Sequence, residues 1–440
     1  MEKLKAKILS AAARHQVEAD IYIEENKRIE VSANDRAIDK VLEADSFGIG
    51  IRLFKGSKMG FGFTTLKDLS GAEKFVDKVM DSVYIEGFNG YKQENPFIIK
   101  DLDISDHDFE LIPMEKRKER ALEIESAAAG ADKRVKYARD TTCVDQKIAV
   151  HYLNTAGASY IYGKTFSYAF TTAIASDNGE DVAVDVMEGD TAWGKINPAA
   201  LGRDAGTRAA ALLNGEALKS GTYDLIIPPY VACEFLQVIS PMFSGANLRK
   251  GKTLLAGAKP GDSFGPEILN IIDNAAMDLR PGSFPVDGEG VKGQAKHLIK
   301  AGKFHSFYYD KISAAHYNIE STGNGVRGSY KALPEAGVSN FYMAAGDLQP
   351  AGILKKEKGI YVNSMMGLHM TDTVSGNFSL GVNGWVYENG EKKKAVKEVL
   401  ITGNVKDFLA NISAIGDDLK FYASFGAPTI VVKGIALAGK

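Results

Sequence analysis

Hydrophobic and polar residues alternate most regularly in a short segment near the N-terminus. Residues 49–53 and residues 59–63 each alternate apolar side chains with polar or small ones, and residues 55–58 have the composition of a turn. Alternation of this kind gives each strand one apolar face, so the segment predicts a β-hairpin. Residues 75–83 then carry apolar side chains at helical spacing, which predicts a helix that covers one face of the sheet.

The same patterns predict further elements on both sides of a boundary at residues 219–222. Strands are expected at 21–23, 29–31, 166–170 and 182–186, and helices at 1–16, 114–129 and 197–213. Beyond the boundary, short alternating runs separated by Gly and Asn dominate the chain, so the second half is expected to be β-rich.

These elements predict an α+β protein. We expect an N-terminal α+β region with a mixed sheet and covering helices, followed by a C-terminal β-rich domain. The division places the N-terminal domain at 1–218, with sub-regions at about 1–100 and 108–218, and the C-terminal domain at 219–440.

Composition narrows the class of protein. The chain of 440 residues is 45% hydrophobic and 25% charged, and its formal net charge is −3. A near-neutral chain has no overall basic field to attract nucleic acid. Cys143 and Cys233 are the only cysteines, which excludes a disulfide-rich secreted scaffold. The first residues lack the apolar core of a signal peptide, and no run of 18 apolar residues occurs. We therefore expect a cytoplasmic protein without a membrane anchor.

Two glycine-containing motifs resemble known sites without matching them. Residues 251–253 have the Gly-Lys-Thr ending of a P-loop, but Ala246 stands where its first glycine is required. Residues 261–265 match the Gly-x-Ser-x-Gly pattern of a nucleophile elbow around Ser263. Prolines on both sides favour a loop there, because the elbow needs a strand before it and a helix after it. Cys233 lies in an apolar run and is expected to be buried.

The histidines offer one possible metal site. His297, His305 and His316 could in principle meet Asp287 or Glu289 around an ion. Their spacings match no standard ligand pair, and no histidine is followed by glutamate as in the helical zinc motif HExxH. Histidines that hold no metal are the favoured interpretation.

Taken in order along the chain, several segments resemble the TldD/TldE metalloprotease family, and specifically its TldE branch, also called PmbA. The most distinctive segment is Phe-Pro-Val-Asp-Gly-Glu-Gly-Val at 284–291. The other matching segments are 48–53, 60–65, 220–224, 321–324, 375–379 and 402–407. The set spans nearly the whole chain, and the resemblance implies an N-terminal α+β region and a β-rich C-terminal domain.

The resemblance also implies where a metal site would lie. TldD-type members carry HExxxH on a helix after the linker; its histidines and a later cysteine hold the metal, and its glutamate is the general base. Aligned on residues 249–251, the histidine positions fall on Leu236 and Pro241, and the glutamate position falls on Gln237. No cysteine follows residue 421. Pro241 must also end or kink the helix. We therefore expect no catalytic residue, no metal ligand and no cofactor in this chain.

The resemblance implies a TldE/PmbA-like, non-catalytic subunit whose partner is an HExxxH-bearing TldD-type protease that degrades or processes unfolded peptides. Whether the chain has activity of its own stays open. The family label "modulator of DNA gyrase" finds no support in the composition as direct DNA binding. One alternative is a homodimeric peptide-binding protein without a protease partner. Another is an autonomous hydrolase that uses His297, His305 or Ser263.

Overall fold

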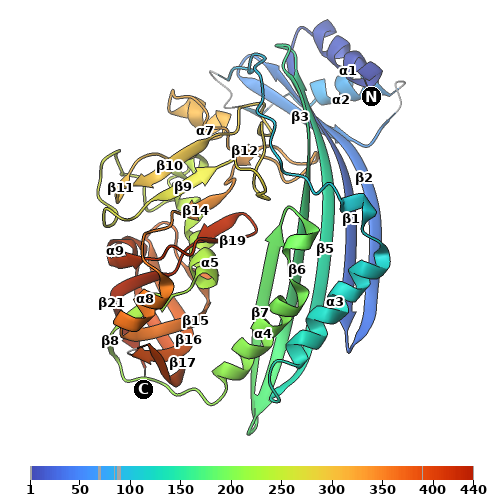
Figure 1. Ribbon diagram of the computed structural model, residues 1–440. Helices are drawn as coiled ribbons and strands as arrows, with labels where there is room; N and C mark the ends of the chain where they lie inside the picture. Colours follow the sequence, from blue (N-terminus) through green and yellow to red (C-terminus); the bar gives the residue numbers. More distant parts are fainter. Residues whose placement is uncertain (1, 68–70, 84, 87–90, 389, 440) are drawn as a thin grey trace.

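The first half of the chain forms one long, curved sheet with helices on its outer side (Figure 1). The computed structural model describes residues 2–67, 71–83, 85–86, 91–388 and 390–439. The strands of this half are β1 (Glu18–Asn34), β2 (Ala37–Lys55), β3 (Lys58–Thr64), β4 (Ile85–Glu86), β5 (Val135–Asn154), β6 (Ser159–Asp177) and β7 (Glu180–Asp190). The helices are α1 (Glu2–Arg14), α2 (Ala72–Met80), α3 (Met114–Ala129) and α4 (Pro198–Leu212). The strands pair in the order β4-β3-β2-β1-β5-β6-β7.

Alternation along β1 separates the two faces of this sheet. Ile21 and Val31 point to the face that the helices cover: Ile21 belongs to a core cluster with α1 and α2, and Val31 to a cluster with α3 and α4. Because side chains of a strand alternate between faces, Tyr22 and Glu24 point to the opposite face. That opposite face meets the C-terminal half of the chain.

The second half contains many short strands. Its strands are β8 (Gly221–Ile227), β9 (Ile271–Asn274), β10 (Ala295–Lys300), β11 (Lys303–Phe304), β12 (Gly325–Val326), β13 (Glu335–Ala336), β14 (Phe341–Met343), β15 (Gly359–Met366), β16 (Asn377–Glu388), β17 (Glu391–Asn404), β18 (Ile412–Ile415), β19 (Lys420–Tyr422), β20 (Phe425–Ala427) and β21 (Ile430–Ala438). Its helices are α5 (Pro229–Ile239), α6 (Gly245–Arg249), α7 (Lys311–His316), α8 (Pro350–Lys356) and α9 (Val405–Ala410).

These strands form two larger sheets around a shared core. One sheet has the order β11-β10-β9-β14-β20-β19, and the other has the order β17-β16-β15-β8-β21-β18. Strand β21 also pairs with β17, which closes β17, β16, β15, β8 and β21 into a small barrel. Helix α5 contacts strands of both sheets and contributes to the main core.

The predicted fold class is confirmed, as are the predicted N-terminal hairpin and helices. The hairpin is β2 and β3, and the helix expected at 114–129 has those limits. Asn197 caps α4 by accepting a hydrogen bond from the backbone N–H of Ala200 at 2.9 Å.

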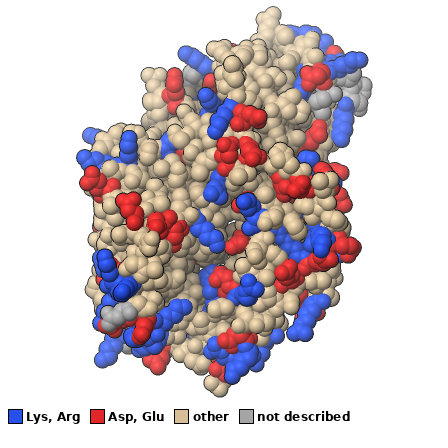
Figure 2. All heavy atoms as spheres, in the orientation of Figure 1, with Lys and Arg blue, Asp and Glu red and all other residues tan. Residues whose placement is uncertain are grey.

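The N-terminal sheet corrects one detail, because its described pairings are antiparallel and not mixed. Short turns join β1 to β2, β2 to β3, β5 to β6 and β6 to β7, and a short turn can connect only antiparallel neighbours. No helix in the described part of the chain is long and apolar enough to cross a membrane. On the face in Figure 2, acidic and basic side chains are interspersed.

Candidate functional site

Helix α5 and the 3-10 turn that follows it carry the positions where the family resemblance places a metal site. Leu236 is 1% exposed and belongs to the main core, whereas Gln237 is exposed on the other side of the helix. The α-helical geometry ends at Ile239, and the chain continues as a 3-10 turn over Ser240–Phe243 that contains Pro241. The side chain of Leu236 therefore packs into the core at the position where the family motif has a histidine ligand.

Of the other sequence candidates, His297 and His305 lie beside each other, and Ser263 forms a β-bridge with Lys303, two residues before His305. Ser263 is exposed in a loop, as its flanking prolines predicted. The rings of His297 and His305 lie 6.3 Å apart between centroids, and His316 is exposed at the end of α7. Asp287 and Glu289 are buried at a different place, described below. Among the described residues, no group of three or more His, Cys, Asp or Glu side chains is placed to hold a metal ion.

Neither cysteine is placed to act as a nucleophile. Cys143 is buried between the N-terminal sheet and its helices, and Cys233 is buried on α5. Burial raises the pKa of both thiols to about 12. Because the thiolate is the reactive form, both side chains behave at neutral pH as small hydrophobic groups.

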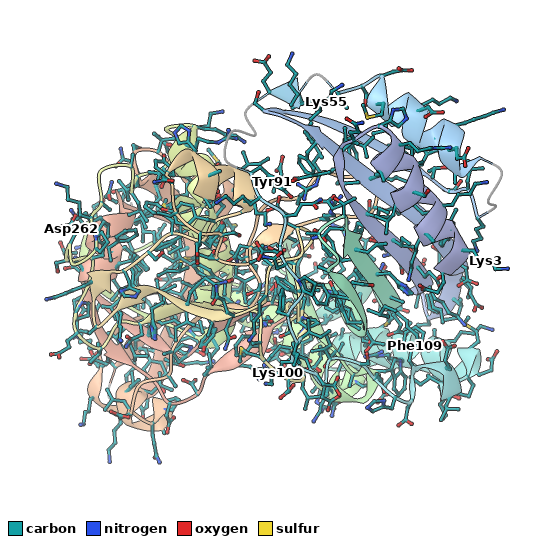
Figure 3. The ribbon with its side chains drawn as sticks, turned by 90° about the horizontal axis from the view of Figure 1, so that it is seen from above. Lys3, Lys55, Tyr91, Lys100, Phe109 and Asp262 are labelled. Atoms are coloured by element: carbon teal, nitrogen blue, oxygen red, sulfur yellow. The ribbon has the colours of Figure 1, made fainter. Side chains whose placement is uncertain are left out.

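The two halves of the chain meet at a buried group of charged side chains, which we call the junction cluster: Asp20, Arg52, Glu289, Arg327 and Tyr91. Arg52 forms an ion pair with Asp20 on β1 and another with Glu289 at 2.8 Å, and all three side chains are fully buried. The guanidinium of Arg327 lies 3.5 Å from Asp20. Two carboxylates thus balance two guanidiniums. Seen from above, Tyr91 lies at this junction (Figure 3).

A second carboxylate shapes the loop that delivers Glu289. Asp287 accepts hydrogen bonds from the backbone N–H groups of Glu289 and Val291, both at 2.9 Å, and from that of Gly325 at 2.8 Å. Burial and the nearby Glu289 carboxylate raise the pKa of Asp287 to about 7, while the three N–H donors oppose this rise. Glu289 also accepts a hydrogen bond from the N–H of Lys311 at 2.6 Å. The segment 284–291 therefore fastens the C-terminal half to the sheet.

Two glycines of β2 allow the halves to approach closely. A Cβ atom on Gly48 would lie 2.1 Å from the ring of Tyr330, and one on Gly50 would lie 2.4 Å from the carbonyl oxygen of Tyr330. Both distances are far below van der Waals contact. The Gly-x-Gly pattern at 48–50 is therefore explained by the contact between the two halves.

The Gly50→Ala variant is expected to lower the free energy of unfolding by about 1–3 kcal/mol, the usual cost of overpacking. The atom in conflict is a backbone oxygen, so no side-chain rotation can relieve it. Urea denaturation measures the change. Gly163→Ala is the matched control, since the nearest atom to its added Cβ is 3.8 Å away. A loss below about 0.5 kcal/mol in Gly50→Ala would contradict the close contact.

Two hollows flank the junction cluster. The larger, of about 1050 Å³, lies between residues 91–97 and residues 291–321. Lys311 forms an ion pair there with Glu94 at 2.8 Å. The smaller, of about 190 Å³, lies between the sheet and the loops that carry Asp287 and Arg327.

Sequence reasoning missed the junction cluster as a unit. It named Asp287 and Glu289 as possible metal ligands and as part of the segment that resembles the family, and it did not consider Asp20 or Arg327. One signal was available: Arg52 interrupts the apolar run at 49–54, where a charged side chain in a predicted strand needs a buried partner.

Comparison with known proteins gives matches along nearly the whole chain. Three family descriptions apply: PmbA/TldA metallopeptidase domain 1 at residues 19–83, the central domain at 107–213 and the C-terminal domain at 220–439. Metalloprotease PmbA of Escherichia coli O157:H7 is 24% identical over 100% of this chain and 96% of its own length. A TldD homologue of Buchnera aphidicola is 31% identical over 49% of this chain and 45% of its own length.

Solved structures share the fold. A Thermotoga maritima protein designated a DNA gyrase modulator has a TM-score of 0.92 at 24% identity, covering 99% of this chain and 100% of its own. TldE of Thermococcus kodakarensis has a TM-score of 0.88 at 20% identity, with the same coverage. At such identities the likeness concerns the fold alone. The matches to the three family descriptions show membership as well as fold: this chain belongs to the PmbA/TldD family of metallopeptidases.

Proposed function

We propose that this chain is a TldE/PmbA-like, non-catalytic subunit of a TldD/TldE-type metalloprotease that degrades or processes unfolded peptides in the cytoplasm. The link to proteolysis rests on relatives over nearly the full length that are named metalloproteases. The non-catalytic role rests on one observation: on α5, Leu236 is packed into the core where the family motif would need a histidine ligand.

The chemistry of α5 supports a silent subunit. A catalytic zinc ion needs about three protein ligands and an open position for water. Leu236 and Pro241 supply no ligand atom, and the amide of Gln237 is too weak a base to take a proton from water. Gln237 also points away from the core that holds Leu236. Peptide hydrolysis by this family would then depend on a partner that brings the metal.

The test is co-expression with an HExxxH-bearing homologue, followed by size-exclusion chromatography, metal analysis and a casein cleavage assay. We expect co-elution, metal in the partner alone, and cleavage by the pair at least about tenfold faster than by the partner by itself, which equals about 1.4 kcal/mol of transition-state stabilisation. Such an interface should bury at least about 1,200 Å² in total.

Variants make the test sharper. Replacing the glutamate of HExxxH by glutamine in the partner should abolish cleavage, whereas Gln237→Ala in this chain should leave the rate of the pair unchanged. Separate elution with equal cleavage by the partner alone would refute the subunit role and favour a homodimeric peptide-binding protein. Stoichiometric metal in this chain, or slower cleavage by a pair that contains Gln237→Ala, would refute the proposal that α5 has no catalytic role.

A further inference from the structure

A groove with apolar walls and a basic rim lies between strand β3 and helix α2, at one end of the molecule (Figure 1). Its volume of about 490 Å³ falls within the range of roughly 300–1,000 Å³ that small-molecule sites occupy. The groove runs beside the edge of the sheet, because β4 pairs only with Lys58 and Met59 of β3 and leaves residues 60–64 without a strand neighbour on that side in the described chain. Its described lining shares no residue with the junction cluster.

The walls of the groove are apolar and reach the surface. Five large side chains form them: Phe61, Phe63, Leu66, Phe75 and Val79. Phe63 is 51% exposed and Leu66 is 43% exposed. Exposed apolar side chains that adjoin one another, with polar residues at their rim, mark a binding surface, because covering them removes hydrocarbon from water.

The charged groups of the groove are of one sign. Lys74 and Lys78 line it, and none of its described lining residues is acidic. The two lysines are exposed, lie one helical turn apart on α2 and form no ion pair with a described residue. The carboxylate of Asp77 on the same helix lies 2.7 Å from His15 of α1, outside the groove. The groove therefore presents positive charge next to hydrocarbon.

This combination restricts the chemistry of a ligand. Two ammonium groups repel a cation, and a small inorganic anion would leave the apolar walls uncovered. An uncharged hydrocarbon would leave two like charges one turn apart without compensation. A long-chain carboxylate meets both requirements: its alkyl chain covers the walls, and its headgroup reaches the lysines, whose aliphatic stems extend the apolar surface.

We propose that this groove binds a free long-chain carboxylate of the fatty-acid type, with its headgroup at Lys74 and Lys78 and its alkyl chain against Phe63 and Leu66. The groove is formed by the N-terminal half of one chain, so the proposal holds or fails independently of the protease role and of any partner subunit.

Isothermal titration of the full-length chain with dodecanoate, below the concentration at which it forms micelles, tests the proposal. We expect saturable binding at millimolar concentration or below. Octanoate should bind at least about tenfold more weakly, because each buried methylene contributes about fourfold in affinity. Dodecyltrimethylammonium has the same alkyl chain and the opposite charge, and it should bind at least about fivefold more weakly than dodecanoate.

Two variants assign the headgroup and the chain to their contacts. The double variant Lys74→Met, Lys78→Met should weaken dodecanoate about fivefold or more and should not weaken dodecyltrimethylammonium. Phe63→Ser should weaken both amphiphiles, because it removes part of an apolar wall that both alkyl chains use. General damage to the fold would not produce this difference between the two ligands.

Exposed residues outside the groove supply matched controls. Lys58 lies on the same strand as Phe63 and pairs with Glu86 at 3.5 Å, and Ile161 on β6 is 57% exposed. Lys58→Met and Ile161→Ser should bind dodecanoate as the unmodified chain does. Absence of saturable binding, or equal affinity for dodecanoate and dodecyltrimethylammonium, would overturn the proposal.

Two further measurements identify other occupants of the groove. Flotation with phosphatidylglycerol vesicles, in a chain that does not bind monomeric dodecanoate, would assign the surface to a membrane. A dimer that dissociates in Phe63→Ser, again without dodecanoate binding, would assign it to a second copy of the chain. Either result would overturn the proposal.

Discussion

The Arg52→Met variant is expected to lose about 3–5 kcal/mol of unfolding free energy, because it leaves the buried carboxylate of Glu289 without a counter-charge. Arg52 pairs with Asp20 from its own sheet and with Glu289 from the C-terminal half, and these side chains are fully buried. Methionine keeps an apolar stem and removes the guanidinium, so the variant loses the charge of Arg52 together with its hydrogen bonds. Urea denaturation gives the size of the effect.

A surface ion pair is the control for this variant. Lys147 pairs with Glu110 at 3.0 Å while both side chains are about half exposed, and such pairs contribute about 0–1 kcal/mol. Lys147→Met should therefore change stability by no more than that. An equal effect of the two substitutions would mean that burial of the junction cluster is not what makes Arg52 important.

The loss in Arg52→Met should also depend on pH. Burial raises the pKa of Glu289 above its ordinary value of 4.5, and Arg52 opposes this rise. Without Arg52, the folded state holds a proton on Glu289 more tightly than the unfolded state does. Above the unfolded-state pKa the folded state therefore binds more protons, and stability falls as pH rises. The deficit relative to the unmodified chain should be larger at about pH 8 than at about pH 5, and a deficit that shrinks with rising pH would contradict this sign.

Local elements of this fold were predictable because their signals are short-range. The hairpin of β2 and β3 follows from alternation within a few residues, and α4 follows from Asn197-Pro198 at its start and a turn after its end. These patterns depend on backbone geometry and one apolar face, and both can be read from a single segment.

Long-range pairings were not predictable in this way. The contact between Arg52 and Glu289 joins residues 237 positions apart, and nothing local to either residue names the other. The closure of the barrel by β17 and β21 and the pairing of β1 with β5 are equally non-local. The prediction of a mixed sheet in the N-terminal region was wrong for the same reason, since no local pattern shows which strands are neighbours.

The site was predictable only where a family pattern supplied positions. The HExxxH pattern points to Leu236 and Gln237 on α5 and to Pro241 just after it. The structure then shows what the spacing of the motif cannot show: Leu236 lies inside the core, whereas Gln237 is exposed. It also shows that Asp287 organises a loop by accepting hydrogen bonds from three backbone N–H groups.

Leu236→Ala is expected to lower the free energy of unfolding by about 2–5 kcal/mol, the range for removing a buried leucine from a core that cannot collapse. Leu236 is 1% exposed on α5, between the two C-terminal sheets, so the lost methyl groups leave a cavity. A chain that had merely lost its metal, and kept an unfilled site, would tolerate the same change. Urea denaturation distinguishes the two cases.

Neighbouring substitutions separate packing from chemistry. Leu236→Met keeps the volume and should cost less than about 1.5 kcal/mol, while Gln237→Ala on the exposed side of α5 should stay within about 0.5 kcal/mol of the unmodified chain. Leu236→His should be destabilised like Leu236→Ala and should gain nothing from added zinc, because Pro241 and the cysteine-free C-terminus supply no further ligand. A stability gain with zinc would show that α5 still holds the elements of a metal site.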